Sequence, residues 1–181
     1  NHDTISYIKS FFVKNYDHSE TPDLDDTHQF SQFFKIIQKF IKCGLITSLH
    51  DISDGGLITS LCELSFTNKV GLNINFSNYK NNNLDELFSE ELGIVVQLSN
   101  IKKEFFAELE AIGCVIYECA QISKSKNIKI FDKDKKLLLD KKIYDLEKIW
   151  SENSLEVRKL RDNPSSAIAE HNALELSLIH I

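Results

Sequence analysis

The residues best suited to chemistry lie in one short turn, His50 to Gly56, which reads His-Asp-Ile-Ser-Asp-Gly-Gly. Asp51 and Asp54 supply carboxylate oxygens, and Ser53 adds a hydroxyl within the same few residues. Magnesium in proteins is usually held by one or two carboxylates together with the phosphates of a substrate. The turn therefore predicts a site for a metal–nucleotide complex.

An apolar run precedes this turn and a helical pattern follows it. Residues 45–49 have the length and composition of a strand, whereas Leu57, Leu61 and Leu64 recur at the spacing of one helical face. The first backbone N–H groups of a helix lack acceptors inside the helix, and the helix dipole favours an anion beside them. The two glycines would let this backbone approach a phosphate closely.

A second interpretation of the turn needs no ligand, because Asp and Ser are ordinary N-cap residues and Gly-Gly is an ordinary turn sequence. Spacing alone leaves both interpretations open. Glu90 and Glu91 form a further acidic pair ahead of a buried strand, with simple exposure as the alternative to a binding role. Arg158 and Arg161 share one side of a later helix, where favourable charge in its last turns is the alternative to binding an anion.

The composition describes one globular domain and excludes several functions. The chain has 181 residues, of which 42% are hydrophobic and 27% charged, and its net charge of -6 argues against a general nucleic-acid binder. No apolar run reaches the roughly 18 residues of a membrane span, and no signal peptide is visible. We therefore expect no nucleic acid and no membrane as partners, and a cytoplasmic location. Without a C-x-x-C pair, the four cysteines should be reduced and mostly buried.

Strand and helix patterns intermingle and predict an α/β (α+β) fold, a mixed β-sheet flanked by helices. An apolar cluster at residues 5–13 predicts a short helix. Further helices are expected after a Thr27 cap, from an Asn100 cap to Ile112, and from about Asp145 to Asp162 with one apolar face. Strands are expected at residues 45–49, 70–76, 93–98, 114–119, 127–131 and 136–139, the last two forming a hairpin.

The helix after Thr27 carries an unusually large apolar face. Its members recur at three- and four-residue spacing and are Phe30, Phe33, Phe34, Ile37, Phe40 and Ile41. Together with the N-terminal cluster they give more apolar area than one small sheet needs. We therefore expect part of this surface to remain exposed.

The turn and four other segments together resemble the large form of phosphoribosylformylglycinamidine synthase. The matching segments are His50 to Leu57, Pro22-Asp23-Leu24-Asp25, Glu90-Glu91-Leu92-Gly93, Trp150 and Leu160-Arg161-Asp162-Asn163-Pro164. The likeness is to the C-terminal lobe of the second aminoimidazole-ribonucleotide-synthetase-like (AIR-synthetase-like) unit. It implies an N-terminal segment from a preceding lobe or linker at 1–21, an AIR-synthetase-like C-terminal domain at 22–163, and a linker toward a glutaminase domain at 164–181.

The resemblance also implies an activity. Enzymes of this family are ATP-dependent C–N ligases of the glutamine amidotransferase type, which convert formylglycinamide ribonucleotide to formylglycinamidine ribonucleotide in purine biosynthesis. By likeness, Asp51 binds Mg²⁺ and Ser53 contacts ATP or ADP at a nucleotide site that is structural. The sister lobe and the glutaminase domain lie outside this chain, so we expect no catalytic residue here and no activity of the chain alone.

Other interpretations remain open at this point. The chain has no methionine and begins with Asn1, so we expect a piece of a longer protein. The same fold would also suit a non-catalytic nucleotide- or protein-binding module, another ATP-dependent enzyme of the AIR-synthetase superfamily, or a separate metal phosphatase built on Asp51 and Asp54.

Overall fold

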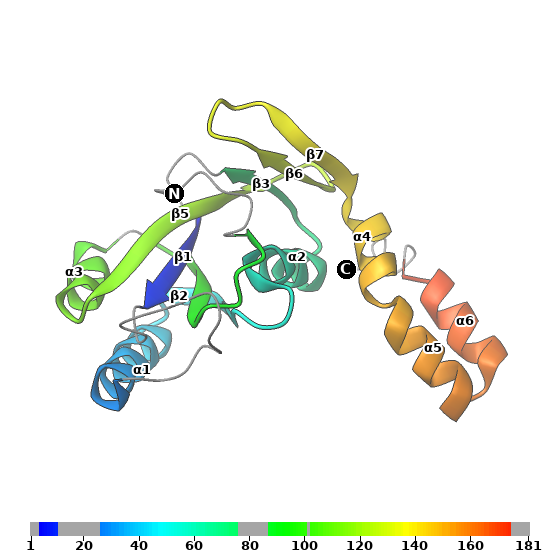
Figure 1. Cartoon of the computed structure of the whole chain (residues 1–181), viewed down its shortest axis with the longest axis horizontal. Coiled ribbons are helices and arrows are strands. Elements are labelled where there is room, and N and C mark those ends of the chain that lie inside the picture. Colours follow the sequence, from blue (N-terminus) through cyan, green and yellow to red (C-terminus); the bar gives the residue numbers. More distant parts are fainter. Residues whose placement is uncertain (1–3, 11–25, 76–86, 101, 175–181) are drawn as a thin grey trace.

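Figure 1 shows a computed structural model of the chain, in which helices flank a twisted β-sheet. The structure describes residues 4–10, 26–75, 87–100 and 102–174. The elements in chain order are β1 (Thr4–Ser10), α1 (Thr27–Lys42), β2 (Ile46–Asp51), α2 (Gly56–Asn68), β3 (Gly71–Asn75), β4 (Gly93–Leu98), α3 (Lys103–Ala111), β5 (Cys114–Ser123), β6 (Asn127–Phe131), β7 (Leu137–Lys142), α4 (Ile143–Trp150), α5 (Glu152–Arg161) and α6 (Pro164–Asn172).

Within the described ranges, seven strands form one sheet in the order β2-β4-β1-β5-β3-β6-β7. Neighbouring strands are antiparallel except for β3 and β6, which are parallel. The predicted fold class, a mixed sheet flanked by helices, is therefore confirmed. The six strands expected from the sequence correspond to β2 through β7, although β5 runs on to Ser123 and residue 76 lies outside the described residues.

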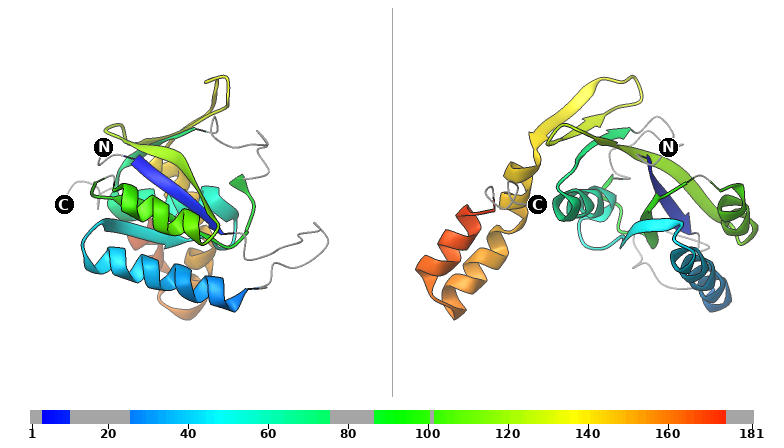
Figure 2. Two further views of the ribbon diagram at one scale, coloured as in Figure 1. Left: turned by 90° about the vertical axis from the view of Figure 1, so that its left-hand side faces the viewer. Right: turned by 180° about the vertical axis from the view of Figure 1, so that it is seen from behind.

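Helices cover both faces of the sheet, and the alternation of side chains along the strands explains how. Ile94 and Val96 of β4 belong to an apolar cluster with α1 and α3, whereas Val95 belongs to a second cluster built around α2. Successive strand residues point to opposite faces, so a strand covered on both sides has apolar residues at consecutive positions, as at residues 94–96 of β4. Figure 2 shows α1 and α3 close together at the end of the molecule away from α5 and α6.

The helix predicted for residues 5–13 is wrong, because residues 4–10 form strand β1. This strand lies inside the sheet, antiparallel to both β4 and β5. Ile5 and Ile8 are buried in the two different clusters, on opposite faces. A short apolar run suits either a strand or a buried helix, and here pairing with strands far away in the sequence decides. Residues 11–13 lie outside the described residues.

Two helix starts differ from the prediction. The N-cap of α1 is Asp26, not Thr27, because the Asp26 carboxylate accepts a hydrogen bond from the backbone N–H of Gln29 at 2.9 Å. The N-cap of α3 is Lys102, which makes no side-chain capping bond. Asn100 lies two residues ahead of that position and therefore does not cap the helix.

The apolar face of α1 is only partly used by the core. Its buried members are Phe33, Ile37 and Phe40, and its exposed members are Phe30, Phe34 and Ile41, with Phe34 the most exposed at 57%. The expectation of an exposed apolar surface on this helix is thus confirmed. Part of the face stays exposed because β2 is the edge strand and nothing described in the chain lies beyond it.

The single helix predicted from Asp145 to Asp162 is two helices, α4 and α5, separated at Ser151. The expected apolar face is exposed at four positions, Ile149, Trp150, Val157 and Leu160. Val157 and Leu160 are exposed because α5 leaves the sheet and packs against α6, so that the two helices lie side by side away from the main body (Figures 1 and 2).

Helix α6 lies in the stretch expected to be a linker. The sequence Asn163-Pro164-Ser165-Ser166 begins it, with the Asn163 side chain accepting hydrogen bonds from two backbone N–H groups and Pro164 in the first turn. This is a common helix start, since proline lacks the N–H that the first turn leaves unpaired. Part of the expected linker is therefore helical.

The start of α2 approaches the segment before β4 very closely at Gly56. A Cβ atom added to Gly56 would lie 2.6 Å from the Phe88 carbonyl carbon and 2.8 Å from the Leu87 and Ser89 carbonyl oxygens. Gly56 also has φ of +73°, a conformation that costs other residues free energy. Two independent constraints therefore require glycine here.

Gly56→Ala should lower the free energy of unfolding by about 3 kcal/mol, because the left-handed conformation and the displaced backbone each cost about 1–2 kcal/mol. Gly44→Ala is the matched control, since Gly44 has φ of +71° but nothing within 4 Å of an added Cβ. That variant should lose only about 1 kcal/mol. Urea denaturation measures both, and equal losses would show that the contact with residues 87–89 has no effect on stability.

Candidate functional site

The predicted strand–turn–helix arrangement is present between β2 and α2. Strand β2 ends at Asp51, and Ile52 turns its side chain into the core while its N–H donates to the Gly93 carbonyl at 2.9 Å. Gly55 is the N-cap of α2, with φ of +84°. The side chains of Asp51, Ser53 and Asp54 remain exposed on the outside of the turn.

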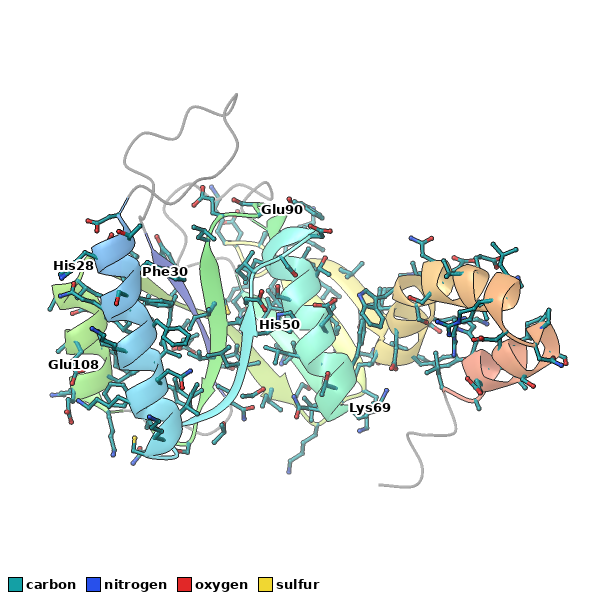
Figure 3. All side chains as sticks on the ribbon, turned by 90° about the horizontal axis from the view of Figure 1, so that it is seen from below. His28, Phe30, His50, Lys69, Glu90 and Glu108 are labelled. Carbon is teal, nitrogen blue, oxygen red and sulfur yellow. The ribbon has the colours of Figure 1, made fainter. Side chains whose placement is uncertain are left out.

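Two backbone amides at the start of α2 already have acceptors within the protein. The Gly55 N–H donates to the Glu90 carboxylate at 2.8 Å, and the Gly56 N–H donates to the Ser53 carbonyl at 2.9 Å. Figure 3 shows Glu90 beside the start of α2. The turn does attract an anionic group, as its geometry predicts, but that group is a side chain of the protein. A phosphate that used the Gly55 amide would have to replace Glu90.

The main chain of Asp51 is held firmly, whereas its carboxylate is free to face solvent. The Asp51 carbonyl accepts hydrogen bonds from the Ser60 hydroxyl at 3.0 Å and from His50 Nδ1 at 2.6 Å. Its side chain is 78% exposed, and one carboxylate oxygen lies 3.6 Å from His50 Nδ1. The result is a fixed backbone that presents a carboxylate outward.

His50 lies within hydrogen-bonding distance of a residue that the sequence analysis did not single out. Its Nε2 atom lies 2.9 Å from Glu63 Oε2, and the other oxygen of Glu63 accepts from the indole N–H of Trp150 at 2.9 Å. Figure 3 shows His50 on β2 alongside α2, which carries Glu63. No pattern of spacing relates Glu63 to Trp150, because they are 87 residues apart.

Two grooves lie on either side of the turn. The first, of about 330 Å³, is strongly apolar and is lined by Phe30 and Phe34 of α1, by Leu49 and Asp51 of β2, and by Leu92. The second, of about 570 Å³, lies between α2 and α4, and its lining includes His50, Ser53, Glu63, Lys69, Glu147 and Trp150. Asp51 and Ser53, predicted to share one ligand, therefore line different grooves.

The donors at the turn suit magnesium better than a metal that needs several protein ligands. Among the residues that the structure describes, no group of three or more His, Cys, Asp or Glu side chains is placed to hold a metal. Asp51 thus offers one exposed carboxylate, which fits Mg²⁺ completed by water and phosphate oxygens. A structural zinc site would need four protein ligands.

The cysteines are not reactive groups of this site. All four are free thiols, as the sequence predicts. Cys114 and Cys119 are buried and Cys62 is half-buried, whereas Cys43 is exposed. Burial raises the pKa of Cys62 to about 12, with a smaller contribution from Glu63, and the pKa of Cys114 to about 11. Since the thiolate is the nucleophile, neither thiol is reactive at neutral pH.

The two arginines do not form a joint anion site. Arg158 Nη1 lies 2.9 Å from Glu170 of α6, whereas Arg161 forms two hydrogen bonds with its neighbour Asp162. The Asp162 carboxylate raises the pKa of Arg161, and the arginine in turn lowers the pKa of Asp162. Both arginines bind carboxylates of the helical pair.

No described helix combines the length and apolarity needed to cross a bilayer.

Comparison with known proteins identifies the family of the chain. A sequence profile for "AIR synthase related protein, C-terminal domain" matches residues 10–133. Phosphoribosylformylglycinamidine synthase from Schizosaccharomyces pombe is 34% identical over 155 residues, which cover 83% of this chain and 12% of that enzyme. The chain therefore spans only a small part of this relative.

Solved structures show the same fold at low sequence identity. T. maritima PurL complexed with ATP superposes with a TM-score of 0.64 and 11% identity, over 78% of this chain and 25% of that chain. The same protein complexed with FGAR gives a TM-score of 0.61, with 12% identity over 80% and 28%. A chain of a HypE–HypF complex gives 0.53, with 15% identity over 78% and 53%. Because the profile covers more than half of the sequence, the chain belongs to the AIR synthase related proteins, as their C-terminal domain.

Proposed function

We propose that this chain is one lobe of a phosphoribosylformylglycinamidine synthase. The observation that carries the proposal is the 34% identity to the Schizosaccharomyces pombe enzyme over 83% of the chain. In this role the whole enzyme is a cytoplasmic, ATP-dependent C–N ligase of purine biosynthesis. It transfers nitrogen from glutamine to formylglycinamide ribonucleotide, and a separate glutaminase domain releases that nitrogen.

Within that enzyme, the lobe contributes a structural magnesium–nucleotide site. Asp51 holds Mg²⁺ and Ser53 contacts ATP or ADP. Bound magnesium would neutralise the phosphates and link them to the turn. The proposal is supported by the exposed Asp51 carboxylate on a backbone fixed by two hydrogen bonds. Because Asp51 and Ser53 line different grooves, a nucleotide that meets both must lie across the exposed turn.

The apolar groove beside α1 is the proposed contact with the sister lobe. Phe30, Phe34, Leu49 and Leu92 line it and are each at least 36% exposed. Apolar patches of this kind usually mark an interface. Since Asp51 lines the same groove, the proposed metal would lie at the edge of that interface.

The activity itself is tested with the whole protein that carries this lobe. It should form formylglycinamidine ribonucleotide from formylglycinamide ribonucleotide, glutamine, ATP and Mg²⁺, whereas residues 1–181 alone should not. Absence of product from the whole protein would favour a non-catalytic nucleotide-binding module. Release of phosphate from a generic phosphomonoester by residues 1–181 alone would instead indicate a metal phosphatase.

Asp51→Asn should weaken binding of ADP in the presence of Mg²⁺ by about tenfold or more, because a charge-assisted ligand is lost. Ser53→Ala should weaken it by a few-fold, as expected for one hydrogen bond. Calorimetry on the whole protein measures both. Asp54→Asn is the matched control, with the same charge change in the same turn, and should not weaken the affinity. Unchanged binding in Asp51→Asn would make the turn a helix cap only.

Glu90→Ala should tighten Mg²⁺–ADP binding about three- to tenfold, because it frees the Gly55 N–H and removes a negative charge next to the phosphates. Glu91→Ala changes the net charge equally without touching the Gly55 amide, so its effect should be smaller. The same calorimetric titration compares the two variants. Weaker binding in Glu90→Ala would show that this carboxylate helps to hold the ligand.

A further inference from the structure

We propose that Glu63 and Trp150 are positioning residues for the turn that carries Asp51 and Ser53. They would act without touching the nucleotide, by fixing His50 and through it the start of the turn. The inference deepens the proposed function, on which it rests, because it concerns the same magnesium–nucleotide site.

A continuous series of polar contacts, two of them hydrogen bonds, joins α4 to the turn. The Trp150 indole N–H donates to Glu63 Oε1 at 2.9 Å, and Glu63 Oε2 lies 2.9 Å from His50 Nε2. His50 Nδ1 then donates to the Asp51 carbonyl at 2.6 Å. Each polar atom of Glu63 thus has its own partner, and the carboxylate is only 22% exposed. His50 is 26% exposed as well, whereas Trp150 is 53% exposed. Because few other arrangements satisfy all these groups, the contacts restrict the orientation of Glu63 and His50.

Other contacts also hold α4, which carries Trp150, against α2. Lys69 Nζ, just after the end of α2, lies 2.6 and 2.7 Å from the two carboxylate oxygens of Glu147 on α4. The ring of Phe66 on α2 lies 5.8 Å from that of Trp150. Two contacts besides the Glu63 hydrogen bond therefore hold α4 against α2, so the indole N–H comes from a fixed element.

The arrangement fixes the backbone of Asp51 while leaving its carboxylate available. Helix α2 provides both Glu63, which holds His50, and Ser60, which donates directly to the Asp51 carbonyl. Ligands bind more tightly to groups that are already ordered, since binding then costs less conformational entropy. Trp150 lies beyond residue 133, where the profile match ends, so α4 supports the turn from outside the segment that the profile covers.

The first test is hydrogen exchange of the Ile52 and Gly56 amides in residues 1–181 without ligand. Glu63→Ala should speed their exchange about tenfold, as expected for loss of a charge-assisted hydrogen bond. Glu63→Gln should restore slow exchange, because its amide oxygen accepts from Trp150 and its NH₂ donates to His50. Trp150→Phe removes only the indole N–H that donates to Glu63, so the two amides should exchange at a rate between those of the wild type and Glu63→Ala.

Glu147→Gln is the matched control. It weakens the other polar contact between α2 and α4 but leaves Glu63 and His50 in place, so exchange in the turn should stay slow. Amides of β1, in the middle of the sheet, report global stability in every variant. Unchanged turn exchange in Glu63→Ala, or equal acceleration in Glu147→Gln or in β1, would overturn the positioning role.

The second test is calorimetry of Mg²⁺–ADP binding to the whole protein. Glu63→Ala should weaken binding severalfold, and Glu63→Gln should recover most of the affinity. If the wild-type protein binds no nucleotide, the proposed function fails, while the exchange experiment still decides whether Glu63 orders the turn. If the wild type binds and Glu63→Ala binds equally well, the positioning role for the site is refuted.

Discussion

At the start of α2 the backbone touches the segment that leads into β4, and the site depends on this contact. Only glycine fits at position 56, because a Cβ there would overlap the main chain of residues 87–89. The approach brings Glu90 to the Gly55 amide and lets Ile52 donate to Gly93. The turn is thus closed from the β4 side by main-chain contact and from the α2 side by Ser60 and Glu63.

Patterns that depend on neighbours in the sequence were predicted well. The strand before the turn, the helix after it, and the burial of Leu57, Leu61 and Leu64 all follow from short-range periodicity, and the structure confirms them. The predictions failed where distant partners decide. Residues 4–10 are a strand because β4 and β5 flank them, and Val157 and Leu160 of α5 are exposed because that helix leaves the sheet and packs against α6.

In the candidate site, too, the residues recognised from local sequence were predicted, and those that depend on distant partners were not. Asp51 and Ser53 stand out because their residue types and spacing suit a metal–phosphate ligand, and their exposure agrees with that role. Glu63 and Trp150 could not be identified in this way, since a glutamate on a helix and a tryptophan 87 residues later have no sequence relation. The contact exists only because α4 packs along α2. Asn163 and Pro164, in contrast, carry a local signal for the start of α6, because asparagine is a common N-cap and proline a common first helical residue.

The charges around the turn bear on how the proposed ligand would bind. Asp51, Asp54, Glu63 and Glu90 all lie in or beside it, in a chain whose net charge is -6. Lys69, which lines the polar groove, is already paired with Glu147. A free phosphate would therefore be surrounded mainly by negatively charged carboxylates, which repel it. A divalent cation reverses that balance, so in the proposed site magnesium binds first or together with the nucleotide, and the phosphates follow the metal rather than the helix amides.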